Sequence, residues 1–160
     1  MKRDGARFAA AFSAAGLAVT EALGARIAAG LGPGDAVALE GDLGAGKTTL
    51  ARAILHALGV DETVPSPSFT LVQQYETARF PVRHYDLYRI EGAEEMNELG
   101  LDEALAEGAV LIEWPERALA FVPEDSLQVR IEVTGESARR IHLSGPERWR
   151  KVLQFEERHG

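Results

Sequence analysis

Residues 41–48 read Gly41-Asp42-Leu43-Gly44-Ala45-Gly46-Lys47-Thr48, and they fit the phosphate-binding pattern G-x-x-x-x-G-K-[ST] at every fixed position. An apolar run at 36–39 precedes this octapeptide, and a helical pattern over 49–58 follows it. Glycines let the backbone curl around a phosphate and aim its N–H groups inward, and the start of the helix adds a positive dipole end. The stretch therefore predicts a nucleoside triphosphate site between a strand and a helix.

Two side chains of this octapeptide have expected roles. Lys47 is expected to reach the β- and γ-phosphates, and the Thr48 hydroxyl is expected to bind Mg²⁺. The 17 basic residues of the chain include only three lysines, Lys2, Lys47 and Lys151, so a compact ammonium at this position stands out. The alternative is a glycine-rich turn that binds no ligand.

The composition is typical of one soluble globular domain, which we take to cover residues 1–160. Hydrophobic residues make up 46% and charged residues 26% of the 160 residues. The absence of cysteine excludes disulfides and thiolate metal sites. No apolar run approaches the roughly 18 residues that a membrane span needs, so we expect a cytoplasmic protein without membrane association. The net charge of −8 argues against a surface built mainly to bind nucleic acid.

Apolar spacing along the chain predicts an α/β fold. Residues 17–31 have the pattern of an amphipathic helix, and the wholly apolar run at 109–112 is typical of a buried strand in a parallel sheet. Segments 71–88 and 127–143 read as hairpins, the second of them at a sheet edge. We therefore expect a three-layer P-loop NTPase-like domain, with a mostly parallel central sheet, antiparallel edge hairpins and flanking helices.

Shorter elements complete this prediction. A short strand over 7–12 could precede the first helix. The acidic segment 93–106 has a helical pattern that Gly100 interrupts, and Pro146 is expected at the start of a closing helix.

A P-loop site also needs a carboxylate at the end of a buried strand, to hold Mg²⁺ or its water shell. Glu113 follows four apolar residues, whereas Asp86 follows the mixed stretch 82–85, so the pattern favours Glu113 as the metal-side acid. Strand alternation puts His84, Asp86 and Tyr88 on one face. That face could orient the attacking water or contact a partner, and a structural ion pair between Asp86 and an arginine is equally compatible with the sequence.

The segment Val64-Pro65-Ser66-Pro67-Ser68-Phe69-Thr70 follows the phosphate-loop helix. Its two prolines exclude a helix, and its hydroxyls could reach a phosphate or Mg²⁺. P-loop proteins that sense the γ-phosphate have switch I at this point of the chain. A plain Ser/Pro turn is the alternative interpretation.

Four motifs occur in order: the octapeptide followed by Thr49, then Ser66-Pro67-Ser68-Phe69-Thr70, His84-Tyr85-Asp86-Leu87-Tyr88-Arg89 and Leu111-Ile112-Glu113-Trp114-Pro115-Glu116. Together they resemble the bacterial threonylcarbamoyladenosine biosynthesis ATPase family TsaE, also known as YjeE, over about residues 17–143. Ser68 stands where that family commonly has threonine, which keeps the hydroxyl.

This resemblance implies a domain that binds and hydrolyses ATP with Mg²⁺, with low activity alone. It implies support for the threonylcarbamoyl modification of adenosine 37 in tRNAs that read codons beginning with A. Family members act with the proteins TsaD and TsaB, and the resemblance implies that tRNA is contacted indirectly, through that complex.

The resemblance also implies roles for individual residues. Lys47, Asp86, Glu113 and Trp114 correspond to catalytic positions, and Thr48 and Glu113 serve the metal. The implied nucleotide-binding residues are Gly41, Asp42, Leu43, Gly44, Ala45, Gly46, Lys47, Thr48 and Thr49, with Thr20 on the first helix and Arg139 in the late hairpin.

Two other functions fit the sequence less well. A small P-loop kinase that phosphorylates a metabolite needs a lid with arginines, but the candidate segment 91–108 holds seven acidic residues and no arginine. A GTP-dependent switch needs an Asn/Thr-Lys-x-Asp run to read guanine, and none of the three lysines has such surroundings. ATP is therefore the expected nucleotide.

Overall fold

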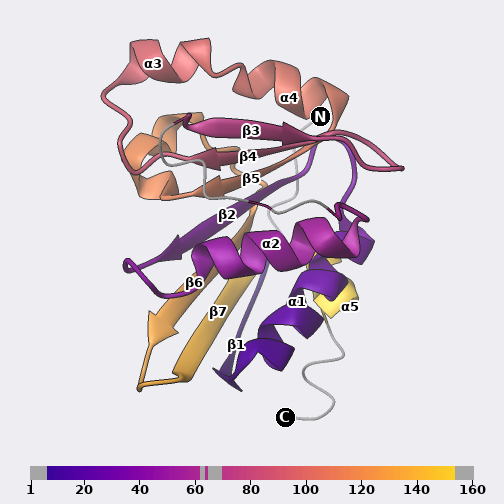
Figure 1. Ribbon diagram of the computed structural model, residues 1–160, viewed down its shortest axis with the longest axis vertical. Coiled ribbons are helices and arrows are strands. Elements are labelled where there is room, and N and C mark those ends of the chain that lie inside the picture. Colours follow the sequence, from indigo (N-terminus) through magenta and orange to yellow (C-terminus); the bar gives the residue numbers. More distant parts are fainter. Residues whose placement is uncertain (1–6, 62–63, 65–69, 154–160) are drawn as a thin grey trace.

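The computed structural model describes residues 7–61, 64 and 70–153, which form a seven-stranded sheet with helices on both faces (Figure 1). The strands are β1 (Arg7–Ala15), β2 (Ala36–Gly41), β3 (Val72–Tyr75), β4 (Val82–Asp86), β5 (Ala109–Glu113), β6 (Leu127–Val133) and β7 (Ala138–Pro146). The helices are α1 (Leu17–Gly30), α2 (Lys47–Ala57), α3 (Ala93–Glu98), α4 (Leu101–Glu107), the 3₁₀ helix η1 (Pro115–Phe121) and α5 (Arg148–Leu153).

The strand order is β1-β7-β6-β2-β5-β4-β3. Strands β6, β2, β5 and β4 run parallel to one another and form the middle of the sheet. Antiparallel strands extend it on both sides, with β3 next to β4, and β7 and β1 beyond β6. All five residues of β5 are buried, as a strand covered on both faces requires. The predicted three-layer α/β fold is confirmed.

Two hydrophobic cores lie on opposite sides of the sheet. The larger one packs α1, α2 and α5 against one face, and the smaller one packs α3, α4 and η1 against β4 and β5 (Figure 1). Along β5, Leu111 enters the larger core, while Val110 and Ile112 enter the smaller one. Each fully buried side chain of this size contributes about 1.5–3 kcal/mol, so a one-residue slip of β5 is strongly opposed.

Three details refine the expected element boundaries. Strand β1 extends to Ala15 and forms the outer edge beside the late hairpin, because it pairs with β7 along its whole length. Alanine is a weak strand former, so this tertiary pairing overrides a poor local signal. Pro146 ends β7 instead of starting a helix, and α5 begins at Arg148. Gly100 does separate α3 from α4, with a left-handed φ of 66°.

In the part of the chain that the structure describes, none of the helices combines the length and apolar character needed to cross a bilayer.

Candidate nucleotide site

The octapeptide forms the loop between β2 and α2. Gly41 ends the strand and Lys47 begins the helix, and the loop glycines Gly41, Gly44 and Gly46 have φ values of 153°, 81° and 119°. A Cβ at Gly41 would also lie 2.7 Å from the Ile131 carbonyl oxygen. These positions therefore need glycine for conformational and steric reasons, which is how a short loop can present its backbone N–H groups to a phosphate.

Lys47 lies against the loop, and its side chain is almost completely buried. Its Nζ donates hydrogen bonds to the carbonyls of Gly41 (2.6 Å) and Asp42 (3.0 Å), and it lies 4.1 Å from the ring centroid of Trp114. Burial lowers the pKa of Lys47 below the ordinary 10.5, and this effect outweighs the opposing attraction of nearby carboxylates, first of all Glu113. The ammonium is thus held by uncharged partners, whose place a charged phosphate can take.

The Thr48 hydroxyl meets the predicted metal-side acid. Its Oγ1 lies 2.9 Å from both Glu113 Oε1 and Glu113 Oε2, although the two residues are 65 positions apart in sequence. Glu113 is the last residue of β5 and is only 2% exposed. A buried carboxylate next to a threonine hydroxyl is the hard-oxygen donor pair that suits Mg²⁺.

His84 contacts the same carboxylate from the neighbouring strand. Its Nε2 lies 2.7 Å from Glu113 Oε2, and both side chains are buried, with 0% and 3% of their surface exposed. The other ring nitrogen, Nδ1, has no hydrogen-bond partner among the described residues. This contact was missed in the sequence, because local patterns contain no information on which residues of β4 and β5 lie opposite each other.

Asp86 lies beside Glu113 in the register of β4 and β5. It is buried, and one carboxylate oxygen accepts the backbone N–H of Tyr88 at 3.0 Å. Asp86 and Glu113 also line one pocket of about 230 Å³, together with Leu43, Gly44, Gly46, Lys47, Thr48, Thr49 and Trp114. Both candidate carboxylates therefore face the phosphate loop.

Trp114 lines one side of this pocket, and its backbone has an unusual conformation. Its φ of 59° and ψ of 50° are left-handed, a conformation that costs a side-chain-bearing residue about 1–3 kcal/mol. The ring packs against Tyr88 with centroids 4.7 Å apart, and the backbone N–H bonds to the Leu39 carbonyl at 3.2 Å. These contacts hold the indole face over the Lys47 ammonium, a favourable cation–π arrangement.

A second pocket, of about 300 Å³, adjoins the other side of the loop. It shares Gly44, Gly46 and Thr49 with the first pocket, and it includes Thr20 of α1 and Arg139 of β7. Arg139 Nε donates to the Ala45 carbonyl at 3.0 Å, so this side chain also ties the phosphate loop to the late hairpin. The two pockets therefore lie against the same phosphate loop and share part of it as a common wall.

Residues 65–69, most of the predicted sensing loop, lie outside the described residues. Thr70 is described in a turn, where its Oγ1 accepts a long hydrogen bond of 3.4 Å from Gln73.

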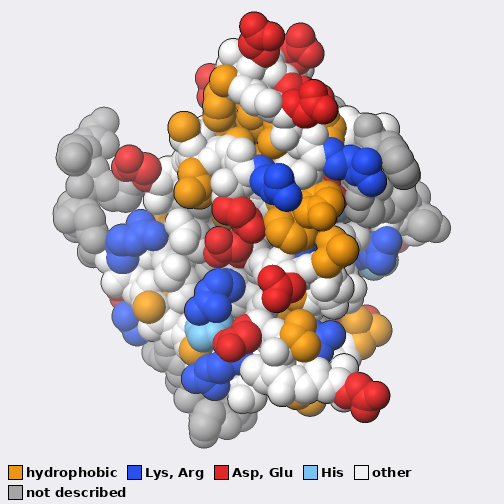
Figure 2. Space-filling view, turned by 90° about the vertical axis from the view of Figure 1, so that its left-hand side faces the viewer, with side chains coloured by type: hydrophobic (Ala, Val, Ile, Leu, Met, Phe, Trp, Pro, Cys, Tyr) orange, Lys and Arg blue, Asp and Glu red, His pale blue; other side chains and the backbone are white. Residues whose placement is uncertain are grey.

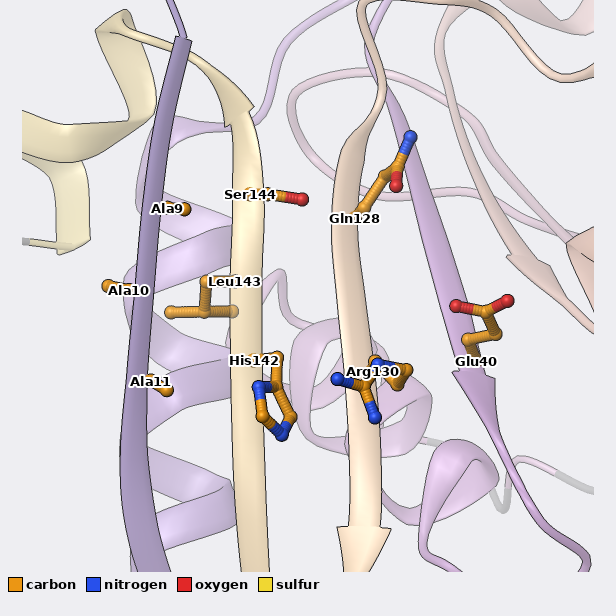
Figure 3. A pocket seen from close by; sticks show the side chains of 9 residues that line it. All are labelled: Ala9, Ala10, Ala11, Glu40, Gln128, Arg130, His142, Leu143 and Ser144. Carbon is orange, nitrogen blue, oxygen red and sulfur yellow. The ribbon is translucent and has the colours of Figure 1, made fainter.

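A larger hollow of about 450 Å³ lies on the sheet face opposite α1, away from the octapeptide (Figure 3). Its lining combines alanines of β1 and Leu143 with polar and charged side chains, among them Glu40 and Arg130 on neighbouring strands and His142 on β7. His142 is also bonded to Glu132 at 3.0 Å. The sparse and mixed set of side chains suits a solvated sheet face better than a ligand site.

Among the described residues, no group of three or more His, Cys, Asp or Glu side chains could hold a metal ion alone. Thr48 and Glu113 are nevertheless suitable donors for Mg²⁺, which is usually held by one or two protein oxygens together with substrate phosphates and water. The residues present therefore fit a metal that arrives with a nucleotide.

A glycine-rich phosphate loop between β2 and α2, facing an acid at the end of β5, defines a P-loop α/β protein. More narrowly, the chain belongs to the TsaE family. The family model described as "Threonylcarbamoyl adenosine biosynthesis protein TsaE" matches residues 15–141.

Individual relatives agree with this assignment. The tRNA threonylcarbamoyladenosine biosynthesis protein TsaE of Rickettsia felis is 43% identical over 121 residues, which cover 75% of this chain and 71% of the relative. The protein of the same name from Bacillus subtilis is 40% identical over 123 residues, with coverages of 76% and 77%. The crystal structure of Bacillus subtilis YdiB superposes with a TM-score of 0.78 at 30% identity and covers 98% of this chain and 99% of that chain.

Proposed function

We propose that this chain binds and hydrolyses ATP with Mg²⁺, and that hydrolysis supports the threonylcarbamoyl modification of adenosine 37 in tRNAs that read codons beginning with A. The observation that carries the chemical part is the contact between the Thr48 hydroxyl and the Glu113 carboxylate at the mouth of the phosphate loop. Membership of the TsaE family supports the biological part.

The phosphates are held by the loop backbone and by Lys47. The α2 N-terminus starts at Lys47, so its free N–H groups and dipole face the same point as the ammonium. An incoming polyphosphate replaces the carbonyls of Gly41 and Asp42 as partners of Nζ. A fully charged partner is stronger than a carbonyl in a buried setting, which favours this exchange.

Metal binding is assigned to Thr48 and Glu113. The pocket contains two carboxylates, Asp86 and Glu113, against one ammonium, so a bare nucleotide polyanion meets net negative charge there. Mg²⁺ supplies the charge that neutralises the phosphates. This balance explains why nucleotide and metal are expected to bind together.

Asp86 is the candidate for orienting the attacking water. Its carboxylate lines the pocket with Lys47 and Thr48, and the bond from the Tyr88 N–H restrains its side chain. Asp86 and Glu113 are the two acids that line this pocket, and Glu113 is assigned to the metal, so the water is assigned to Asp86.

The nucleoside is assigned to the second pocket. Thr20 and Arg139 line it from α1 and β7, and Gly44 to Thr49 separate it from the metal-side pocket. A nucleotide lying across the loop therefore extends its phosphates to one side and its base and ribose to the other.

The partners are expected to be TsaD and TsaB, with tRNA contacted through their complex. The net charge of −8 supports an indirect tRNA contact, because a direct grip on a polyanion needs a basic surface. Acidic side chains gather at the top of the molecule, over α3 (Figure 2), and α4 carries further acidic residues in its first turn. This also disfavours the kinase alternative, whose lid must close over phosphate with arginines.

The decisive experiment measures ATP hydrolysis by the chain alone, with candidate small acceptors, and with TsaD and TsaB present. We expect a low rate alone and a higher rate with the two proteins. Strong ADP release that depends on a small acceptor and ignores both proteins would contradict the proposal and favour a kinase.

Three variants test the residue roles in the same assay. Lys47→Ala is expected to abolish nucleotide binding, because it removes the ammonium from the loop. Glu113→Ala is expected to keep nucleotide binding and to lose turnover that depends on Mg²⁺. If Asp86→Ala showed that metal-linked loss and Glu113→Ala did not, the two carboxylates would have to exchange roles.

A further inference from the structure

We propose that His84 is a positioning residue, whose ring holds one oxygen of Glu113 so that the carboxylate stays directed at the Thr48 hydroxyl and at a metal ion bound there. The inference rests on the proposed function, because it concerns the acid assigned to the metal. His84 acts through Glu113, and it is not among the described residues that line the pocket of about 230 Å³.

The geometry of the three side chains supports this role. His84 Nε2 lies 2.7 Å from Glu113 Oε2, a distance typical of a hydrogen bond to a charged acceptor. Glu113 Oε1 remains 2.9 Å from Thr48 Oγ1 and is the oxygen that the ring does not engage. A carboxylate can only accept hydrogen bonds, so Nε2 carries the proton and donates it.

The sheet explains why a histidine can reach this carboxylate. In the parallel pairing of β4 and β5, His84 lies opposite Leu111 and Asp86 lies opposite Glu113. Side chains alternate along a strand, so His84, Asp86 and Glu113 project from the same face. The ring reaches diagonally from β4 to β5, past its direct partner Leu111 to Glu113, two residues further along β5.

A positioning role also explains why the core contains a buried polar side chain that costs free energy. His84 is completely buried, and its Nδ1 has no hydrogen-bond partner within the described ranges. An apolar side chain would fill the space without leaving a polar atom unpaired, so core packing alone does not favour histidine. The Nε2–H donor is what the ring adds, because Glu113 has three side-chain torsions to order.

Three substitutions separate the donor from the bulk of the ring. His84→Gln keeps an N–H near the position of Nε2, His84→Asn carries its amide near Nδ1 and cannot reach Glu113, and His84→Leu removes the donor. Binding of Mn²⁺ to the protein–ADP complex is measured by electron paramagnetic resonance, and binding of ADP without metal by calorimetry. Thermal unfolding shows which variants fold.

We expect His84→Leu and His84→Asn to weaken Mn²⁺ binding by about 10- to 100-fold, while metal-free ADP binding and the Mn²⁺ affinity of His84→Gln stay within about threefold of the original chain. The proposal is overturned if Gln and Asn bind Mn²⁺ equally well, or if metal-free ADP binding falls by the same factor as metal binding. The contrast between Gln and Asn remains informative if His84→Leu does not fold.

A Glu113→Gln control separates this inference from the function it rests on. If Glu113→Gln leaves Mn²⁺ binding unchanged, the assignment of Glu113 to the metal fails and the positioning role fails with it. If Glu113→Gln weakens Mn²⁺ binding and the His84 variants do not, only the role of His84 is lost.

Discussion

Lys47, the proposed phosphate-binding side chain, is buried against the loop. Its ammonium is buried and bonded to two backbone carbonyls, and burial is the main reason why its pKa lies below 10.5. In the pH window between that lowered pKa and 10.5, the unfolded chain binds more protons than the folded one. The contribution of Lys47 to the free energy of unfolding therefore rises with pH in this window.

Nucleotide binding is expected to reverse this shift, because phosphates favour the ammonium. ADP binding at alkaline pH just below 10.5 should therefore be accompanied by proton uptake, and uptake at pH 7 should be smaller. Calorimetric titrations in two buffers of different ionisation enthalpy measure the protons taken up. Lys47→Arg is the control, because a guanidinium stays protonated and should show none of the pH-dependent uptake. Proton release on binding would contradict the prediction.

Among single residues, the sequence reveals the site only in part. The octapeptide and the acid after four apolar residues could be identified, and the structure brings Thr48 and Glu113 together. The bond from His84 to Glu113 could not be foreseen, because it depends on the register of two strands. The left-handed backbone of Trp114 carries no local signal either, since left-handed turns are usually marked by glycine or asparagine.

The pairing of strand β4 with β5 brings the two acids of the candidate site together. Gly108 precedes β5, and a Cβ built on it would lie 1.9 Å from the Pro81 carbonyl, which accepts the Ala109 N–H at 3.1 Å. The backbones approach so closely here that a methyl group must push the two strands apart. That movement would reach Asp86 and Glu113, which lie opposite each other at the far end of the pair.

Gly108→Ala is accordingly expected to lower the free energy of unfolding by about 1–3 kcal/mol or more, as overpacking does. Gly92→Ala is the matched control, because Gly92 also has an extended backbone and a Cβ there would meet nothing within 4 Å. The free energy of unfolding of that control should stay within about 0.5 kcal/mol of the value for the original chain. Urea denaturation measures both, and equal stabilities of the two variants would disprove the close-approach argument.

Helices and strands could be predicted from the sequence where the spacing of their apolar residues is regular. The helix at 17–31, the hairpins and the buried strand at 109–112 were all expected from apolar spacing, and the structure has an element at each. The full length of β1 was not predictable, because its alanines form a strand only by pairing with β7. Whether such a segment forms a strand depends on a pairing partner that is distant in sequence, and local propensity carries no information about that partner.

For the whole molecule, the candidate site joins parts that are remote in sequence. The phosphate loop follows β2, its acids end β4 and β5, and Arg139 of β7 bonds to the Ala45 carbonyl. A ligand that contacts all of these parts binds only the folded chain, because the unfolded chain has no such site. Occupancy of the site is therefore linked to global stability.

ATP with Mg²⁺ at about 100 times its dissociation constant is expected to raise the free energy of unfolding by about 2.7 kcal/mol. Thermal unfolding with and without the nucleotide measures the effect. Lys47→Ala should keep its own melting temperature unchanged on addition of ATP and Mg²⁺. If the melting temperature of that variant rose as much as that of the original chain, the nucleotide would bind elsewhere.

The antiparallel ladder between β1 and β7 has a mechanical consequence. Arg7 lies opposite Pro146, so the beginning of β1 and the end of β7 are at the same end of the ladder. A force that pulls these two points apart acts on one pair of residues at a time, as in a zipper, and does not shear all nine pairs together. A force applied between Arg7 and Pro146 would therefore peel β1 away from β7, while the phosphate loop between β2 and α2, which is not part of this ladder, is not loaded directly.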